Sequence, residues 1–241
     1  MSDLILLFLI STAAFTLKAM TGFGPAIILI CLGSFFFLPQ NLVPLAAILD
    51  LAAGIALFRT TASDKHRGFW IPLAIAIVIG SVIGGLLLNH LSVDHFKTIM
   101  SVAVFFIGAT FLFGSPAGKM AVLPGRPSSA DGFFSFFGGI CGGLIGIDGP
   151  PLVWHFGQKF SKKAFRQVLV PVFAAAALAR VITYGFAGMI STQVLIFCGA
   201  AIPGLMLGLF IGNRVFIKID QTWFERLIGF ILMGISIRHL W

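Results

Sequence analysis

The sequence has 241 residues, of which 59% are hydrophobic and only 10% are charged, and its mean hydropathy is +1.06. Soluble domains carry about 25% charged residues on a polar exterior, so this composition excludes an ordinary water-soluble protein. The formal net charge is +8, but the basic residues are spread over short loops between apolar runs. That pattern is typical of a membrane-orientation signal and not of a nucleic-acid-binding surface.

Apolar runs follow one another along the whole chain, many of them near the roughly 17–25 residues that cross a bilayer as a helix. Asp3 stands where a secretory signal would carry positive charge, so we expect the first run to be retained. We predict an all-α polytopic membrane protein that forms a single membrane domain over residues 1–241. The expected apolar segments are 3–20, 25–38, 42–58, 69–91, 96–114, 132–145, 150–158, 166–187, 192–213 and 224–241.

A polar linker at residues 115–131 separates two halves of the chain that share landmarks. Gly22-Phe23-Gly24-Pro25 corresponds to Gly146-Ile147-Asp148-Gly149-Pro150, with one residue inserted. Because transporter folds are commonly built from two repeats, we predict internal repeats at 1–114 and 132–241. Further landmarks recur at a nearly constant offset: Val43-Pro44-Leu45 with Val170-Pro171-Val172, Gly80 and Gly84 with Gly208 and Gly212, and Phe96 with Phe224.

The connections indicate how the halves are oriented, because short loops rich in Lys and Arg stay cytoplasmic. The central linker and the loop 159–166 are basic, so the hairpin 132–158 should enter and return on the cytoplasmic side. By symmetry, the hairpin 3–38 should start and end outside. This predicts inverted repeats, each a broken hairpin followed by three transmembrane helices. The residues leave open that run 3–20 spans the membrane alone. The connections without Lys or Arg, expected outside, are 39–41, 92–95 and 188–191.

Each hairpin turns at a glycine-rich break at membrane depth, where irregular backbone is tolerated only if it is buried in protein or lines a cavity. A proline stands where each second half-helix should begin, at Pro25 and Pro150. A helix N-terminus carries about half a positive charge, so two converging ends would make an anion site; the alternative is packing kinks without a ligand. The glycines that permit the breaks are Gly22, Gly24, Gly146 and Gly149. The N–H groups expected to face the centre belong to Ala26, Ile27, Leu152 and Val153.

Charged residues inside the apolar runs are candidates for function, since an intramembrane charge is costly. Lys18 lies one helical turn before the first break and either adds positive charge there or extends to the interface. Arg180 is expected in binding or in a structural pair within the transport path. Asp50 either pairs with one of these cations or carries a proton. Asp148, in the second break, is either protonated, paired with a cation or the cap of the following helix.

Other residues that could take part in chemistry are expected to have structural roles. His155 has no second ligand at metal spacing, and no cofactor motif is present, so we expect neither a metal nor a cofactor. Cys31, Cys141 and Cys198 lie in apolar runs and are expected to act as small buried hydrophobes, with sulfur handling as the alternative. Glycines at small-xxx-small spacing indicate close helix packing: Gly80, Gly84, Gly85, Gly208 and Gly212.

Two glycine-rich motifs carry a resemblance to a known family. They are Thr21-Gly22-Phe23-Gly24-Pro25 and the segment from Gly143 to Leu152, Gly-Leu-Ile-Gly-Ile-Asp-Gly-Pro-Pro-Leu. The chain resembles the TauE/SafE family of sulfite exporters and related anion permeases, which have a glycine-rich motif near the start of each repeat. Pro25 replaces a glycine common in that motif, and Asp148 stands among the glycines of the second. The resemblance implies a carrier of sulfite, thiosulfate, sulfonates or other small organic anions, in either direction.

We therefore predict a multi-pass secondary transporter of the cell inner membrane, not an enzyme, that exports a small sulfur-containing or organic anion. Proton coupling would use Asp50 or Asp148. The alternatives are a passive anion channel, a thiosulfate-type uptake permease using the membrane cysteines, or a membrane-embedded enzyme. Expected partners are the anion and the lipid bilayer; a homodimer is compatible with so small a chain. The expected substrate-binding residues are Thr21, Gly22, Phe23, Gly24, Pro25, Gly146, Ile147, Asp148, Gly149, Pro150, Lys18 and Arg180.

Overall fold

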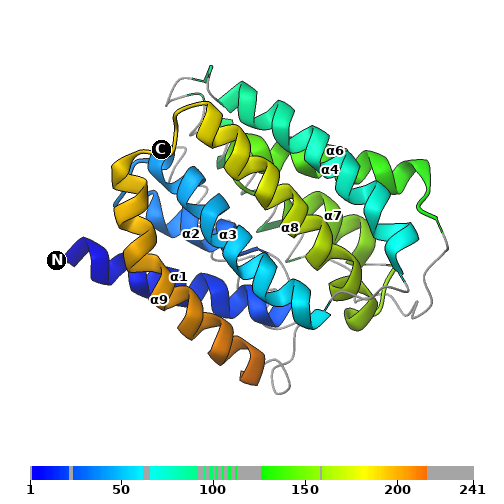
Figure 1. The fold of residues 1–241 in the computed structure, drawn as a ribbon, viewed down its shortest axis with the longest axis horizontal. Helices are drawn as coiled ribbons and strands as arrows, with labels where there is room; N and C mark the ends of the chain where they lie inside the picture. The colour runs from blue at the N-terminus through cyan, green and yellow to red at the C-terminus, as the bar shows by residue number, and fades with distance from the viewer. Residues whose placement is uncertain are drawn as a thin grey trace.

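The computed structural model describes residues 2–21, 24–61, 66–88, 90–91, 126–157 and 159–215, with isolated positions between 95 and 112. The described residues form helices joined by short connections, which confirms the predicted all-α class (Figure 1). The segment predicted at 224–241 and most of 96–114 and of the central linker lie outside the described residues. The helices are α1 (Ser2–Thr21), α2 (Pro25–Gly33), α3 (Pro39–Thr61), α4 (Arg67–Leu88), α6 (Ser129–Ile145), α7 (Gly149–Gly157), α8 (Lys162–Phe186) and α9 (Thr192–Val215).

Most helix bounds lie within a few residues of the predicted segments, and α2 is the exception. The apolar run 25–38 predicts a longer helix, but α2 ends at Gly33. The N–H groups of Phe36 and Phe37 both donate to the Gly33 carbonyl, at 2.9 and 2.8 Å, so the chain turns there instead of continuing the helix. The predicted segment was too long because the residues after Gly33 are also apolar.

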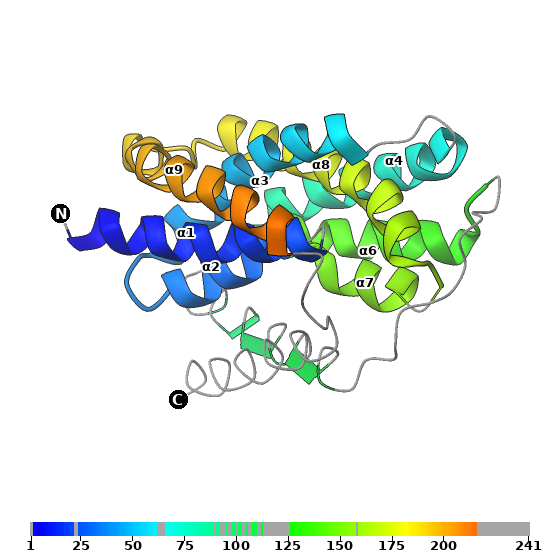
Figure 2. The ribbon, with the colours of Figure 1, turned by 90° about the horizontal axis from the view of Figure 1, so that it is seen from below.

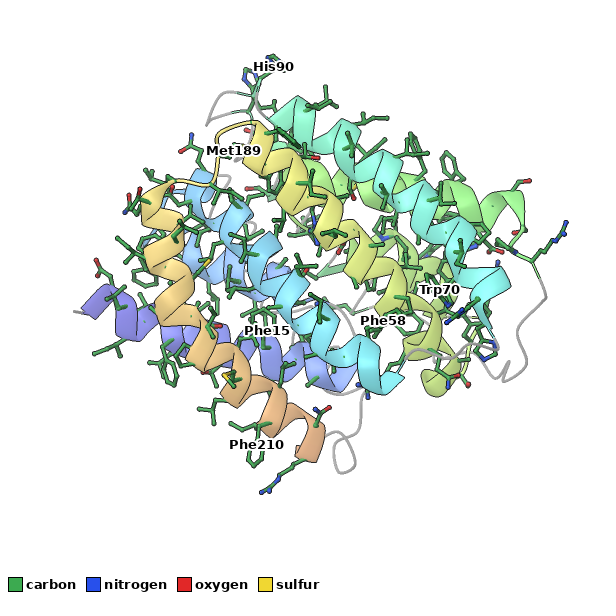
Figure 3. The ribbon with its side chains drawn as sticks, viewed as in Figure 1. Phe15, Phe58, Trp70, His90, Met189 and Phe210 are labelled. Carbon is green, nitrogen blue, oxygen red and sulfur yellow. The ribbon has the colours of Figure 1, made fainter. Side chains whose placement is uncertain are left out.

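Four helices of the described chain are long and apolar enough to cross a membrane, and they face outward with apolar side chains. Phe210 is 55% exposed and points away from α9, whereas Phe15 lies between helices and is buried (Figure 3). Large apolar groups exposed over whole helix faces fit a lipid surrounding. The chain is a polytopic membrane protein, as its composition predicts. The four spans are Gln40–Phe58, Arg67–Leu88, Ala164–Phe186 and Thr192–Arg214.

The helices α2 and α7 are half-helices of 9 residues each. At 1.5 Å per residue they reach roughly 14 Å, about half of a 30 Å hydrocarbon core. In Figure 2, α1 and α6 extend toward the middle of the molecule from its two ends. The half-helices α2 and α7 lie on one side of this layer, and α3, α4, α8 and α9 lie on the other. The predicted broken hairpins are therefore α1–α2 and α6–α7.

The main helix pairs of the described structure correspond when the two halves are exchanged, although α2 packs more extensively on α3 than α7 does on α8. Helix α1 of the first half packs on α9 of the second, and α6 of the second half packs on α4 of the first (Figures 1 and 2). Likewise, α3 of the first half packs on α9, and its counterpart α8 of the second half packs on α4. The two counterparts α3 and α8 pack on each other at the centre. Such an exchange is expected of a duplicated chain. The opposite orientation of the halves in a membrane stays a prediction.

Glycines bring the backbones of α4 and α6 into direct contact. A methyl group at Gly80 would overlap the carbonyl oxygen of Phe136, and one at Gly84 would overlap that of Ile140. The same holds in reverse for Gly139 and Gly143 of α6 against α4. On the other side of the molecule, Gly204, Gly208 and Gly212 of α9 meet the α1 backbone in the same way. The predicted small-residue packing is confirmed, and it fastens each hairpin to a helix of the other half.

Candidate anion-binding site

The two breaks occur at glycines with left-handed backbone. Gly24 precedes α2 with φ 85°, and Gly146 ends α6 with φ 78°. These values lie where an L side chain is disfavoured, so the sequence has little choice but glycine at both points. Pro25 is the first residue of α2 and Pro150 the second of α7, as predicted. Thr21 ends α1, while Gly22 and Phe23, also predicted in the site, lie outside the described residues.

The half-helix ends supply fewer N–H donors than the sequence suggests. The expectation that the Ile27 N–H is free is wrong, because it donates to the Gly24 carbonyl at 3.2 Å. Helix α7 starts with Gly149-Pro150-Pro151, and prolines have no N–H, so Leu152 and Val153 come after the first turn. Positive charge for an anion therefore has to come mainly from side chains.

The four charged residues singled out in the apolar runs meet in one buried cluster. Lys18 Nζ lies 2.5 Å from Asp50 Oδ1, and Arg180 Nη2 lies 3.0 Å from Asp50 Oδ2. Arg180 Nη2 is also 3.1 Å from Asp148 Oδ2. The side chains of all four are at most 9% exposed. Asp50 thus pairs with both cations, and Lys18, which is buried, does not extend to an interface.

Arg180 connects this cluster to the second break. It is fully buried on α8, and its Nη1 donates to the Gly146 carbonyl at 3.0 Å. One turn farther along α8, the Tyr184 hydroxyl donates to the Gly143 carbonyl at 2.7 Å. Residues four apart on a helix share a face, so α8 holds the end of α6 at two points. Sequence reasoning missed Tyr184; its signal was a lone tyrosine, the only one in the chain, one turn after a buried arginine.

On the side of the ion cluster that faces the second break, two buried polar atoms lack a hydrogen bond among the described residues. Within the described part of the chain, Arg180 Nε has no acceptor, and Asp148 Oδ2 receives no hydrogen bond. The 3.1 Å approach of Arg180 Nη2 to Asp148 is therefore an ion pair without a directed N–H. A buried polar group left unsatisfied costs about 1–3 kcal/mol and calls for a functional explanation. Asp50, by contrast, has both oxygens hydrogen-bonded.

The first half of the chain also lines the second break. Ile30 of α2 and Val43 of α3 surround Gly146, and a Cβ at that position would lie 2.5 Å from Ile30 Cδ1. Ile147, the next residue, is buried in the same apolar core. Predicted site residues Pro25, Gly149 and Pro150 are buried as well. The second break is thus enclosed by α2, α3 and α8, with Arg180 as its cation.

His155 belongs to a separate polar cluster at the far end of the second hairpin. His155 Nε2 lies 2.7 Å from Asp131 Oδ1, and Lys159 Nζ lies 3.0 Å from the same oxygen. Asp131 also completes a capping box with Ser128 at the start of α6. Asp131 and Lys159 were missed, although the Ser-x-x-Asp spacing at 128–131 and the four-residue spacing from His155 to Lys159 were visible.

Asp131 lies in the first turn of α6, outside the four membrane-spanning helices. Burial acts to raise the pKa of its carboxyl, but hydrogen bonds from the Ser128 backbone, His155, Lys159 and the Ser128 hydroxyl outweigh it. The pKa falls from 3.8 to about 2. The carboxylate therefore stays ionised in this cluster at neutral pH and ties the start of α6 to the end of α7.

The cysteines lie on three different helices, and none forms a disulfide. Cys31 of α2 and Cys198 of α9 are buried in the apolar core, and Cys141 of α6 is partly buried. In the described residues, no group of three or more His, Cys, Asp or Glu side chains could hold a metal ion. The role of the cysteines stays a prediction.

Broken hairpins joined at a buried ion cluster in a polytopic helical protein are features of membrane transporters. The chain belongs to the TauE/SafE sulfite exporter family, whose model matches residues 7–239. It is also similar to a protein of Cupriavidus necator described as "Probable sulfite/organosulfonate exporter TauE", with 26% identity over 167 residues. The match covers 68% of this chain and 64% of the relative, so it spans less than two thirds of that protein's length. No solved structure matches the chain.

Proposed function

We propose that the protein is a secondary transporter of the cell inner membrane that exports a small sulfur-containing anion such as sulfite or an organosulfonate. The observation that carries the proposal is Arg180, a fully buried guanidinium beside a helix break, with no acceptor for its Nε–H among the described residues. The family and the name of the C. necator relative point to the same solute class.

The anion would bind at the second break, between Arg180 and the start of α7. Guanidinium groups bind oxyanions through two parallel N–H donors. In Arg180 these would be the Nε–H and the second N–H of Nη2, since Nη2 has two N–H groups and donates one to Asp50. Nη1 is engaged with the Gly146 carbonyl, so the Nε and Nη2 edge has a fixed direction. The Gly149 N–H and the partial positive charge of the α7 N-terminus would add to it.

The glycine interfaces suggest which parts would move to alternate access. Helix α6 touches α4 backbone to backbone, and α1 touches α9 in the same way, so each pair should move as one body. The relative motion would then occur where α3 and α8 cross, which is where Asp50 and Arg180 meet. Rocking of two such bodies around a central site is the common route of alternating access.

Counterflow of radiolabelled sulfite in proteoliposomes tests the proposal, with competition by a panel of sulfonates and carboxylates. We expect saturable exchange, with sulfonates competing better than carboxylates. Arg180→Gln should abolish it. Arg214→Gln is the matched control, because Arg214 is exposed at the end of α9 over the Phe210 ring and should leave exchange unchanged. Flux that does not saturate would indicate a passive channel, and absence of exchange from folded protein would reject an anion carrier.

A further inference from the structure

We infer that the charge balance of the buried cluster makes the carrier specific for a monovalent oxyanion, moved together with one proton that resides on Asp148. This rests on the proposed transport function and deepens it, because it assigns the charge of the substrate and the residue that carries the proton. Two observations support it independently of the family: the neutrality of the cluster and the unequal contacts of its two carboxylates.

Among the described residues, the cluster contains equal numbers of positive and negative charges. Lys18 and Arg180 supply two positive charges, and Asp50 and Asp148 supply two negative ones, all buried. Burying an unbalanced charge in a low-dielectric interior is strongly unfavourable. An anion that enters this site therefore has to bring one compensating positive charge for each of its own. A proton on one carboxyl group supplies that charge for a monovalent anion.

Asp148 is the carboxyl group that can take the proton at least cost. Asp50 accepts hydrogen bonds on both oxygens, from Lys18 and from Arg180, so a proton there would disrupt two ion pairs. Asp148 Oδ2 has only the undirected contact with Arg180 and no hydrogen bond among the described residues. An oxyanion that occupies the Nε and Nη2 edge of Arg180 would replace Asp148 as the counter-ion. Protonation of the displaced carboxyl group restores the balance.

The groups that act on Asp148 come from each surrounding element. Burial and Asp50 oppose its charged form, whereas Arg180 and Lys18 favour it. Tyr184 of α8 and Cys141 of α6 also lie within electrostatic range. When an anion takes over Arg180, the largest attraction on the carboxylate is lost and the repulsion from Asp50 and from the anion remains. Anion and proton binding should therefore be cooperative, so that neither moves alone.

The same balance disfavours divalent anions. Sulfate or thiosulfate would need protons on both carboxyl groups, and the second proton would have to displace Lys18 and Arg180 from Asp50. Organosulfonates and hydrogen sulfite carry a single charge and need only Asp148. Net movement of one anion with one proton is electroneutral, so the flux follows the product of their concentrations and export occurs when the anion accumulates inside.

The test uses radiolabelled methanesulfonate and the wild-type protein in proteoliposomes. A gradient of about one pH unit, acid outside, should drive up to about tenfold accumulation, since 1.4 kcal/mol corresponds to a factor of ten. Clamping the membrane potential at different values should leave the flux unchanged. A pH-sensitive dye inside the vesicles should report about one proton per anion, and sulfate and thiosulfate should compete poorly.

The Asp148→Asn variant tests whether Asp148 holds the proton, because asparagine has nearly the same shape as aspartate and stays neutral. We expect counterflow of methanesulfonate to persist, accumulation in a pH gradient to disappear, and the flux to become dependent on membrane potential. Asp3→Asn, at an exposed position near the start of α1, is the control and should behave as wild type. If the Asp148→Asn protein does not fold, Asp148→Ser, which is smaller and also cannot ionise, replaces it with the same expected results. The wild-type proton count tests the one-to-one coupling in either case.

Separate outcomes distinguish this inference from the proposed function. Saturable exchange that depends on voltage, ignores the pH gradient or accepts sulfate as well as methanesulfonate would overturn the inference and leave the anion carrier standing. So would pH-driven accumulation by the Asp148→Asn protein. Absence of saturable exchange by the wild type, for methanesulfonate and sulfite alike, would overturn both.

Discussion

Arg180 donates a hydrogen bond from Nη1 to the carbonyl oxygen of Gly146, 3.0 Å away, and thereby joins a transmembrane helix to the left-handed residue that ends α6. The two residues are 34 positions apart, and the bond is buried. One guanidinium thus contacts the helix break and both carboxylates of the ion cluster. A solute that binds Arg180 will therefore act on the position of the break.

Arg180→Lys should abolish transport while retaining most of the fold. A lysine keeps one positive charge for Asp50 and Asp148, but it lacks the planar fork that contacts Asp50 and Gly146 together. We expect sulfite counterflow to fall about 100-fold or more, since a lysine ammonium cannot form the bidentate pair of a guanidinium with an oxyanion. Thermal unfolding in detergent should show a smaller loss of stability than for Arg180→Gln, which leaves Asp50 with Lys18 alone and takes the cation from Asp148. Breaking a buried ion pair by removing one partner costs about 3–5 kcal/mol. Equal stability of the two variants would contradict this role for the charge.

Gly84→Ala should weaken the protein because the added methyl group overlaps the Ile140 carbonyl oxygen where α4 touches α6. Overpacking of this kind costs about 1–3 kcal/mol. Gly199→Ala is the matched control: Gly199 also lies within a helix, α9, but a methyl group there meets nothing within 4 Å among the described atoms. Its midpoint of thermal unfolding should stay the same or rise, because alanine is favoured over glycine in helices. Similar midpoints for the two variants would argue against direct backbone contact between α4 and α6.

The polar cluster at the far end of the second hairpin predicts a pH dependence of stability. The pKa of Asp131 is lowered from 3.8 to about 2, so its folded form prefers the ionised carboxylate. The resulting stability is fully present above pH 3.8 and is lost as the pH falls toward 2. The Asp131→Asn variant should therefore be less stable than wild type at pH 5, by on the order of 2 kcal/mol. The difference should shrink as the pH approaches 2, measured by thermal unfolding in an acid-tolerant detergent. A difference that stays constant over this range would assign the effect to shape and not to charge.

Local chemistry explains which parts of the site could be predicted from sequence. Glycine allows left-handed backbone and proline fixes φ at the residue where each stands, so the breaks at Gly24 and Gly146 could be located. A charge in an apolar run has to be neutralised, so a pairing of Asp50 with a cation could be expected. That Asp50 holds both Lys18 and Arg180 depends on how α1, α3 and α8 pack, and no spacing along the chain encodes it.

The N–H donors predicted at the starts of the half-helices α2 and α7 were wrong for a related reason. The sequence shows the prolines at 150 and 151, but the consequence depends on where α7 begins, at Gly149. Had the helix begun two residues later, Leu152 and Val153 would have been in its first turn. The exchange of helix partners between the halves likewise follows from tertiary packing, although the glycines that permit it were visible.

Gly146→Ala should impair transport through the contact with Arg180. An alanine at φ 78° is strained by about 1–2 kcal/mol, and its methyl group would meet Ile30 Cδ1 at 2.5 Å. Relief of that contact should shift the Gly146 carbonyl and with it the guanidinium of Arg180. Gly188→Ala is a matched control, because Gly188 has φ 70° and nothing within 4 Å of a Cβ in the described structure. Both variants carry the same backbone strain, so they should lose similar stability from that source. Only Gly146→Ala should reduce sulfite counterflow beyond what the amount of folded protein explains, by about tenfold or more. Equal counterflow from the two variants would mean that the position of the second break does not govern the anion site, and that Arg180 acts without the break it contacts.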